Sequence, residues 1–112
     1  MKYEQKILEA EQRLAVRFSQ DGREVHALLD AAAADALARE LALQAALVGE
    51  RMVTVQFGRD FVMLEKRVAL DVVVALIKGK LRLEELAEAE RIARDSAILL
   101  RAGANFGLSN DP

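Results

Sequence analysis

The sequence predicts a mainly α-helical protein, a bundle of about four helices with one short β segment, Met52–Phe57, between the second and third helices. The only proline of the 112 residues is the last one, and an interior without proline favours long helices. Apolar residues make up 53% of the chain and aromatic residues only 4%, so the surplus is alanine, leucine and valine. Small apolar side chains indicate closely packed helices in one domain over residues 1–112, with more apolar surface than a small monomer hides easily.

The first two helices are predicted from apolar periodicity and alanine content. Lys2–Ser19 has apolar residues at alternating spacings of four and three. Asp21, with a glutamate three residues later, has the form of a capping box. A second helix is therefore expected over Gly22–Val48, ended by Gly49. Its alanine-rich stretch is either a strong helix former or a seam that a neighbouring helix approaches closely.

The segment Met52–Phe57 is predicted to be extended. Val53, Val55 and Phe57 alternate with two polar residues, which is the period of a half-buried strand. A lone strand leaves backbone groups unpaired. We therefore expect it to pair with the same strand of a second chain, with a solvated linker or a helix as the alternatives.

The most apolar stretch of the chain, Val68–Ile77, lies in the third predicted helix, Phe61–Lys78. All of its residues except Asp71 are apolar, and a helix of that composition is expected to be buried on most sides. Asp60 suits the N-cap, and Gly79 suits the position just beyond the C-terminal end. A run of three valines inside this stretch also suits a buried strand, which stays an alternative.

The last predicted helix, Leu83–Ala102, follows a short turn at Lys80–Arg82. Glutamates crowd its first turns and arginines come later, which matches the helix macrodipole. Its inner face is expected to consist of Leu86, Ala89, Ala93, Ala97 and Leu100. The tail, 104–112, is expected to be flexible or to dock on a neighbour.

Asp71 is the one charged residue of the apolar stretch, and Arg67 lies one turn before it. An unpaired buried carboxylate is costly. We therefore predict either a salt bridge between these two side chains at the boundary of the core, or a polar residue that fixes the register of an oligomer interface.

The apolar surplus predicts self-association, and the interface candidates come from the alanine seam, the strand, the central helix and the tail. They are Ala32, Ala36, Val53, Val55, Phe57, Val72, Leu76, Phe106 and Leu108.

The composition offers little catalytic or metal-binding chemistry. The chain has no cysteine and a single histidine, His26, which is expected at the surface or at its boundary. Neither a paired set of catalytic groups nor a Glu-x-x-His motif on facing helices is evident. We therefore predict a protein that is not an enzyme and that has no cofactor, no metal and no small-molecule substrate.

The expected function is that of a non-enzymatic structural or assembly subunit that self-associates into a homo-oligomer or a larger bacterial or phage-like complex. An adaptor or chaperone that binds other proteins is the first alternative. The second rests on the segment MVTVQFG followed by two predicted helices, which resembles a ribbon-helix-helix repressor. That resemblance implies a dimeric DNA-binding protein whose paired β-ribbon reads the major groove through Thr54 and Gln56.

Charge and hydropathy indicate partners and location. The net charge of −2 gives no global attraction to phosphate, so the expected partners are further copies of the chain and other proteins, not nucleic acid. The N-terminal residues lack the apolar core of a signal peptide, and no apolar run is long enough to span a bilayer. We therefore expect a cytoplasmic protein or a component of a soluble assembly.

Overall fold

The computed structural model describes residues 1–47 and 51–106, which form five strands and two helices. The first sheet is antiparallel, in the order β1 (Lys2–Leu8), β2 (Arg13–Gln20) and β3 (Arg23–Leu29). The helix α1 (Ala31–Ala46) follows it. The second sheet is a hairpin of β4 (Met52–Phe57) and β5 (Asp60–Glu65), and the long helix α2 (Lys66–Phe106) comes last.

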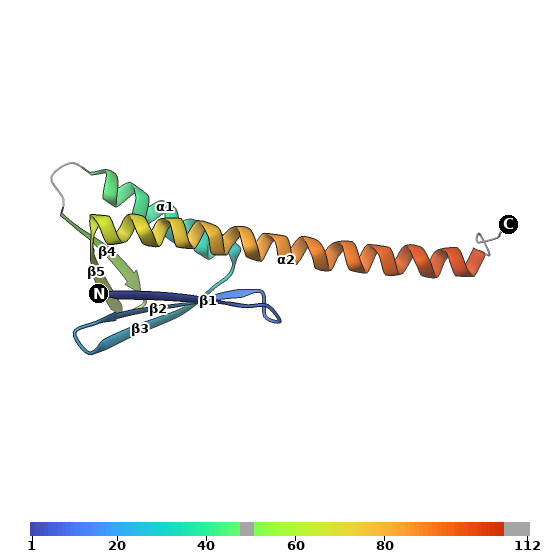
Figure 1. Ribbon diagram of the computed structural model, residues 1–112, viewed down its shortest axis with the longest axis horizontal. Helices are drawn as coiled ribbons and strands as arrows, with labels where there is room; N and C mark the ends of the chain where they lie inside the picture. The colour runs from blue at the N-terminus through green and yellow to red at the C-terminus, as the bar shows by residue number, and fades with distance from the viewer. Residues whose placement is uncertain (48–50, 107–112) are drawn as a thin grey trace.

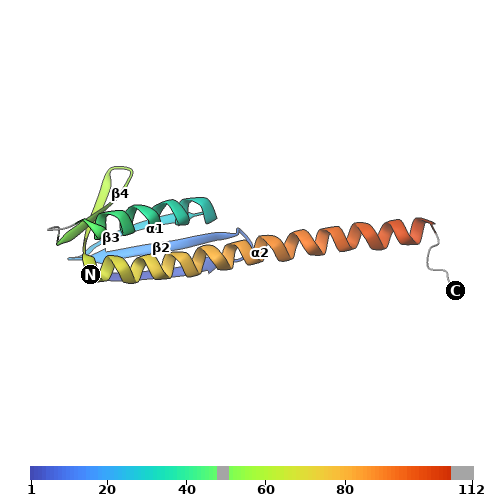
Figure 2. The ribbon, with the colours of Figure 1, turned by 90° about the horizontal axis from the view of Figure 1, so that it is seen from above.

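This architecture contradicts the expected four-helix bundle. The fold is α+β, with two helices over two antiparallel sheets in the described part of the chain. Figures 1 and 2 show α1 and α2 side by side, with α2 continuing far beyond the sheets. The described protein is consequently elongated, with principal extents of 71 × 29 × 19 Å.

The first sheet replaces the predicted helix Lys2–Ser19. Leu14, Val16 and Phe18 alternate along β2, and each is at most 2% exposed. Tyr3 of β1 and Val25 of β3 lie directly opposite Phe18 on its two sides, so the apolar side chains form rows across one face of the sheet. The helix prediction is wrong because the apolar residues of β2 recur at every second position, as in a strand. The spacing of the apolar residues in β1 fits a helix as well, and it does not continue through β2.

A tight turn at Asp21 and Gly22 joins β2 to β3. Both residues have positive φ, 50° and 79°, and the flanking pair Gln20–Arg23 closes the hairpin. Asp-Gly is a preferred pair for such two-residue hairpin turns, because both central residues must tolerate positive φ. The predicted capping box at Asp21 is therefore wrong.

Eight residues, 23–30, separate the loop of this hairpin from the start of helix α1. Asp30 is its N-cap, and its carboxylate accepts a hydrogen bond of 2.8 Å from the backbone N–H of Ala33. The predicted helix Gly22–Val48 is thus wrong over β3 and correct over Ala31–Ala46. Its expected end at Val48 and Gly49 lies outside the described residues.

The strand Met52–Phe57 is confirmed with the predicted bounds. Val53 and Val55 are buried and Phe57 is half-buried, whereas Thr54 and Gln56 are exposed. Its partner, however, is β5 of the same chain and not a second copy of itself. The first five residues of the predicted helix Phe61–Lys78 belong to this partner strand.

The in-chain pairing of β4 also removes the basis for the ribbon-helix-helix resemblance. That family needs one strand from each of two chains, followed by two helices. Here β4 is followed by a second strand and then by one helix of 41 residues. The topology thus contradicts the fold on which DNA reading by Thr54 and Gln56 depended.

One position on the free edge of β4 is covered by a side chain of α1. The Gln44 amide donates to the carbonyl of Thr54 at 2.8 Å and accepts from the N–H of Thr54 at 3.0 Å. An exposed edge strand offers unpaired backbone groups to other chains. Gln44 occupies both groups of Thr54, so this position is not open for pairing with another strand.

Gly79 lies inside α2, although the sequence placed it at a helix end. A Cβ at this position would come within 2.8 Å of Leu14 Cδ2 and 3.3 Å of Gln5 Nε2. The same Gln5 side chain donates to the carbonyl of Ala75 at 2.8 Å. Glycine is therefore needed here for close packing of α2 on β1 and β2, and the predicted break at Gly79–Arg82 is wrong.

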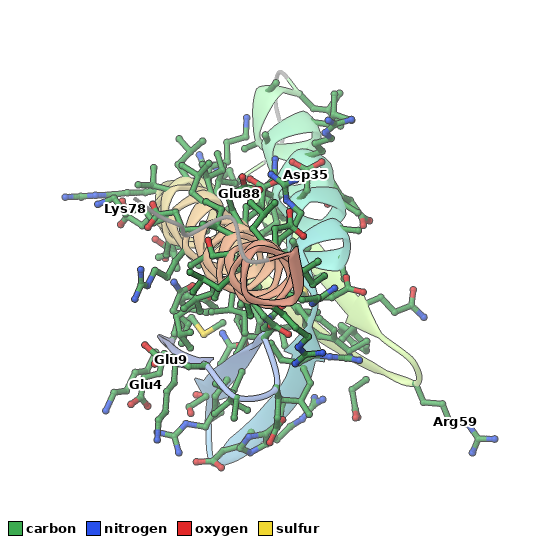
Figure 3. All side chains as sticks on the ribbon, turned by 90° about the vertical axis from the view of Figure 1, so that its right-hand side faces the viewer. Glu4, Glu9, Asp35, Arg59, Lys78 and Glu88 are labelled. Atoms are coloured by element: carbon green, nitrogen blue, oxygen red, sulfur yellow. The ribbon has the colours of Figure 1, made fainter. Side chains whose placement is uncertain are left out.

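Only one side of the apolar stretch Val68–Ile77 is buried. Ala69, Val72 and Leu76 are at most 1% exposed and lie in the core with Leu14 and Leu64. Figure 3 looks along α2 and shows the first sheet below it, the hairpin of β4 and β5 to its lower right, and α1 above and to its right. The opposite side of the stretch has no cover among the described residues, contrary to the prediction of burial on most sides.

Candidate protein-docking surface

Beyond the sheets, α2 continues as a single exposed helix. Leu83, at 2% exposure, is the last buried residue among those whose burial is described. We name residues 84–106 of α2 the arm; at 1.5 Å per residue it is about 35 Å long. Figure 1 shows the arm leaving the rest of the molecule, which we name the body.

The arm carries large apolar side chains that are more than half exposed to solvent. Between Glu84 and Arg101 every residue is exposed except Leu86, which is half-buried. The exposed fractions are 54% for Ile92, 57% for Ile98, 71% for Leu99 and 77% for Leu100. Full burial of one such side chain is worth about 1.5–3 kcal/mol, so a partner surface would gain substantially by covering them.

The predicted inner face of the last helix lies on this arm. Its residues are spaced by three, four, four and three, which keeps them on one side of the helix. They are Leu86, Ala89, Ala93, Ala97 and Leu100. In the described chain the last four of them are exposed, so the face that was expected to pack against the rest of the protein has no partner within the body.

Charges on the arm are separated along its length. Four glutamates and one arginine lie between Glu84 and Ile92, a net charge of −3, whereas two arginines and one aspartate lie between Arg94 and Arg101, a net charge of +1. A hydrogen bond and the charge of the Arg91 guanidinium lower the pKa of Glu88 below its usual range. Both residues are exposed, so this ion pair adds little stability.

Two contacts mark where the body ends and the arm begins. Arg82 forms an ion pair of 3.6 Å with Glu9, and the Gln12 amide donates to the carboxylate of Glu90. Glu9 and Gln12 both belong to the turn between β1 and β2. The arm therefore touches the body near its base through polar side chains.

A second uncovered apolar row lies on the part of α2 that packs on the body. Its residues are spaced by four, three and four, and all point away from the core. They are Leu70, Val74, Ile77 and Leu81, each between 43% and 52% exposed. We name them the outer row. Lys78, on the same helix, extends away from the body in Figure 3.

The predicted interface residues are distributed over the core, the surface and the end of the chain. Val53, Val55, Val72 and Leu76 are at most 1% exposed, and their side chains fill the chain's own core. Half-buried Phe57 packs against that core. These five side chains therefore have little or no surface to offer a partner in this fold.

The remaining candidates lie elsewhere. Ala32 and Ala36 are exposed on α1, on the side away from buried Ala34 and Ala38. Phe106 is the last residue of α2, and Leu108 lies outside the described residues. Whether these four residues contact another chain stays a prediction.

Asp71 and Arg67 do not form the predicted salt bridge. Both side chains are exposed, and no ion pair joins them in the described part of the chain. Asp71 is therefore not a buried, paired carboxylate, because it lies on the solvent side of α2; whether it fixes the register of an oligomer interface stays a prediction. His26 is exposed as expected, but its Nε2 lies 3.1 Å from a Glu24 carboxylate oxygen on the outer face of the first sheet.

The outer row was missed by sequence reasoning, although its signal was present. Leu70, Val74 and Ile77 were included in a stretch that was expected to be buried all round. Their spacing sets them opposite Ala69, Val72 and Leu76 on the helix, which indicates two separate apolar faces.

Comparisons with protein-family models, with curated proteins and with solved structures found no match. Within residues 1–47 and 51–106, no group of three or more histidine, aspartate or glutamate side chains is arranged to hold a metal ion. In the same residues, neither helix has a stretch long and apolar enough to cross a membrane.

Proposed function

We propose that this protein is a non-enzymatic assembly subunit that associates with further copies of itself, and that α2 supplies the contact surface. The observation that supports this proposal is the uncovered apolar surface of α2, which includes both the outer row and the arm. Exposed apolar side chains that gather along one element, rather than occurring singly, are typical of a protein interaction site.

The physics of isolated helices supports the same proposal. Most helical stability in proteins comes from packing an apolar face, and isolated helices shorter than about 12–15 residues are marginal in water. The arm is somewhat longer, but among its described residues the hydrogen bond and ion pairs that join it to the rest of the chain involve polar side chains near its base. A second protein surface along the arm would stabilise the helix and cover Leu99 and Leu100 together.

Neither the strand Met52–Phe57 nor the buried side of Val68–Ile77 supplies the proposed contact surface. The strand finds its partner within the chain, and the buried half of the stretch Val68–Ile77 fills the core. The exposed apolar surface of α2, which the fold of the single chain leaves uncovered, is what supports self-association.

Size-exclusion chromatography with light scattering tests the proposed function. We expect a mass of at least twice 12.3 kDa at micromolar concentration. A mass of 12.3 kDa throughout the micromolar range would contradict self-association, and would leave an adaptor that binds a different protein as the better account.

A further inference from the structure

We propose that the arms of two copies pair in antiparallel orientation, about a two-fold axis midway between Ala89 and Leu100. This inference rests on the proposed function and names the partner of one part of that surface. The axis places Ala89 of each arm opposite Leu100 of the other, so that a small side chain faces a large one at both outer layers.

The centre of this pairing contains only small residues. Ala93 of one copy lies opposite Ser96 of the second copy and beside its Ala97. Small side chains allow two helix backbones to approach closely, and the layers at positions 89, 93, 96 and 100 follow the spacing of an antiparallel coiled coil. Neither side chain at the two central layers, Ala93 and Ser96, is too large for close approach.

The flanks of the pair also match. When two identical helices pair in antiparallel orientation, the same flank of each helix lies against that flank of the other. Ile92 of one arm therefore lies within about one turn of Leu99 of the other. On the opposite flank, Glu90 lies within about one turn of Arg101 of the second copy. Ile92 and Leu99, now 54% and 71% exposed, would thus cover each other, and opposite charges would line the other side.

The distribution of charge along the arm favours an antiparallel orientation, and it favours a second copy of the chain as the partner of the arm. Antiparallel pairing sets the half of one arm with net charge −3 against the half of the other with net charge +1. Parallel pairing would set −3 against −3, and like charges at the edges of paired helices disfavour that arrangement. It would also bring the two bodies to the same end, whereas antiparallel arms place them at opposite ends.

Thiol crosslinking tests both the orientation and the register. The chain has no cysteine, so each substitution introduces its only thiol. Ala89→Cys and Leu100→Cys chains are mixed, equilibrated and treated with a short thiol-to-thiol crosslinker. We expect at least ten times more covalent dimer from the mixture than from either variant alone, because equivalent positions in the antiparallel pair are 11 residues, about 16 Å, apart.

Two further variants serve as controls. Ala93→Cys alone should crosslink efficiently, because the two positions are separated by only about 4.5 Å along the axis. Leu28→Cys, at an exposed position of β3, should not crosslink above background.

The outcomes separate this inference from the proposed function. Efficient crosslinking of Ala89→Cys alone would show parallel arms and overturn the inference. A multiple of the chain mass without any crosslink at positions 89, 93 or 100 would also overturn it, while self-association would stand. A monomeric wild-type chain would overturn both.

Discussion

Replacing Phe18 with alanine is expected to lower the free energy of unfolding by about 3–5 kcal/mol. Phe18 is 1% exposed, and its ring centroid lies 4.9 Å from that of Tyr3 and 5.6 Å from that of Phe57. The contact with Phe57 joins the first sheet to the hairpin of β4 and β5, and the contact with Tyr3 lies within the first sheet. Total stability of a small domain is about 5–15 kcal/mol, so the variant should be severely destabilised in a urea titration.

Phe61→Ala is the matched control for this prediction. Phe61 also belongs to a strand but is 50% exposed. We expect its replacement to cost less than about 1 kcal/mol, as for most surface substitutions. Equal losses for the two phenylalanines would contradict the core described for this fold.

Ala93→Glu is expected to weaken self-association by a factor of about 100 or more. In the proposed pair the two new carboxylates would lie close together at the centre of the interface, where burial and like-charge repulsion both oppose association. Because position 93 is exposed on the arm of the single chain, the substitution should leave its folding unchanged. Light scattering across a dilution series, with far-ultraviolet circular dichroism as a check on helix content, measures the effect.

Leu70→Glu and Ala93→Lys provide the controls for Ala93→Glu. Leu70→Glu removes an exposed leucine of the outer row but lies outside the arm, so it should not weaken pairing of the arms. A mixture of Ala93→Glu and Ala93→Lys chains should restore pairing, because opposite charges then meet at the centre. Loss of association in Leu70→Glu but not in Ala93→Glu would assign the contact to the outer row instead.

The sequence predicted the strand Met52–Phe57 and most of both helices, because these segments have clear periods. Val53 and Val55 alternate with polar residues, and Ala31–Ala46 is rich in strong helix formers. The sequence also predicted that Leu86, Ala89, Ala93, Ala97 and Leu100 share one face. It could not show that this face lies on an arm beyond the body, because that depends on where the sheet ends.

The three-stranded sheet was not predicted, and the reasons are particular. Tyr3, Ile7 and Leu14 have helical spacing by coincidence, since Gln5 occupies the inner face of β1 and bonds to α2. Asp21-Gly22 fits both a capping box and a hairpin turn, and only the pairing of β2 with β3 distinguishes them. Tertiary contacts, not local propensity, decide both positions.

Gly79 in α2 is a further position at which the local sequence does not determine the structure. Gly79 suggested a helix end, because glycine is the usual residue just beyond one. Its role in the structure is set by Leu14, which lies 65 positions earlier in the sequence and leaves no room for a Cβ. No local pattern separates these two uses of glycine.

Amide hydrogen exchange along the arm, measured at several protein concentrations, tests whether a second copy of the chain covers the arm. We predict that the amides between Glu84 and Arg101 exchange slowly at concentrations where the chain is self-associated. On dilution to the monomer they should exchange at least ten times faster, while those of the buried strand β2 stay protected. Exchange of the arm that is equally fast at every concentration, or equally slow in the monomer, would show that no second copy covers it and would contradict the account.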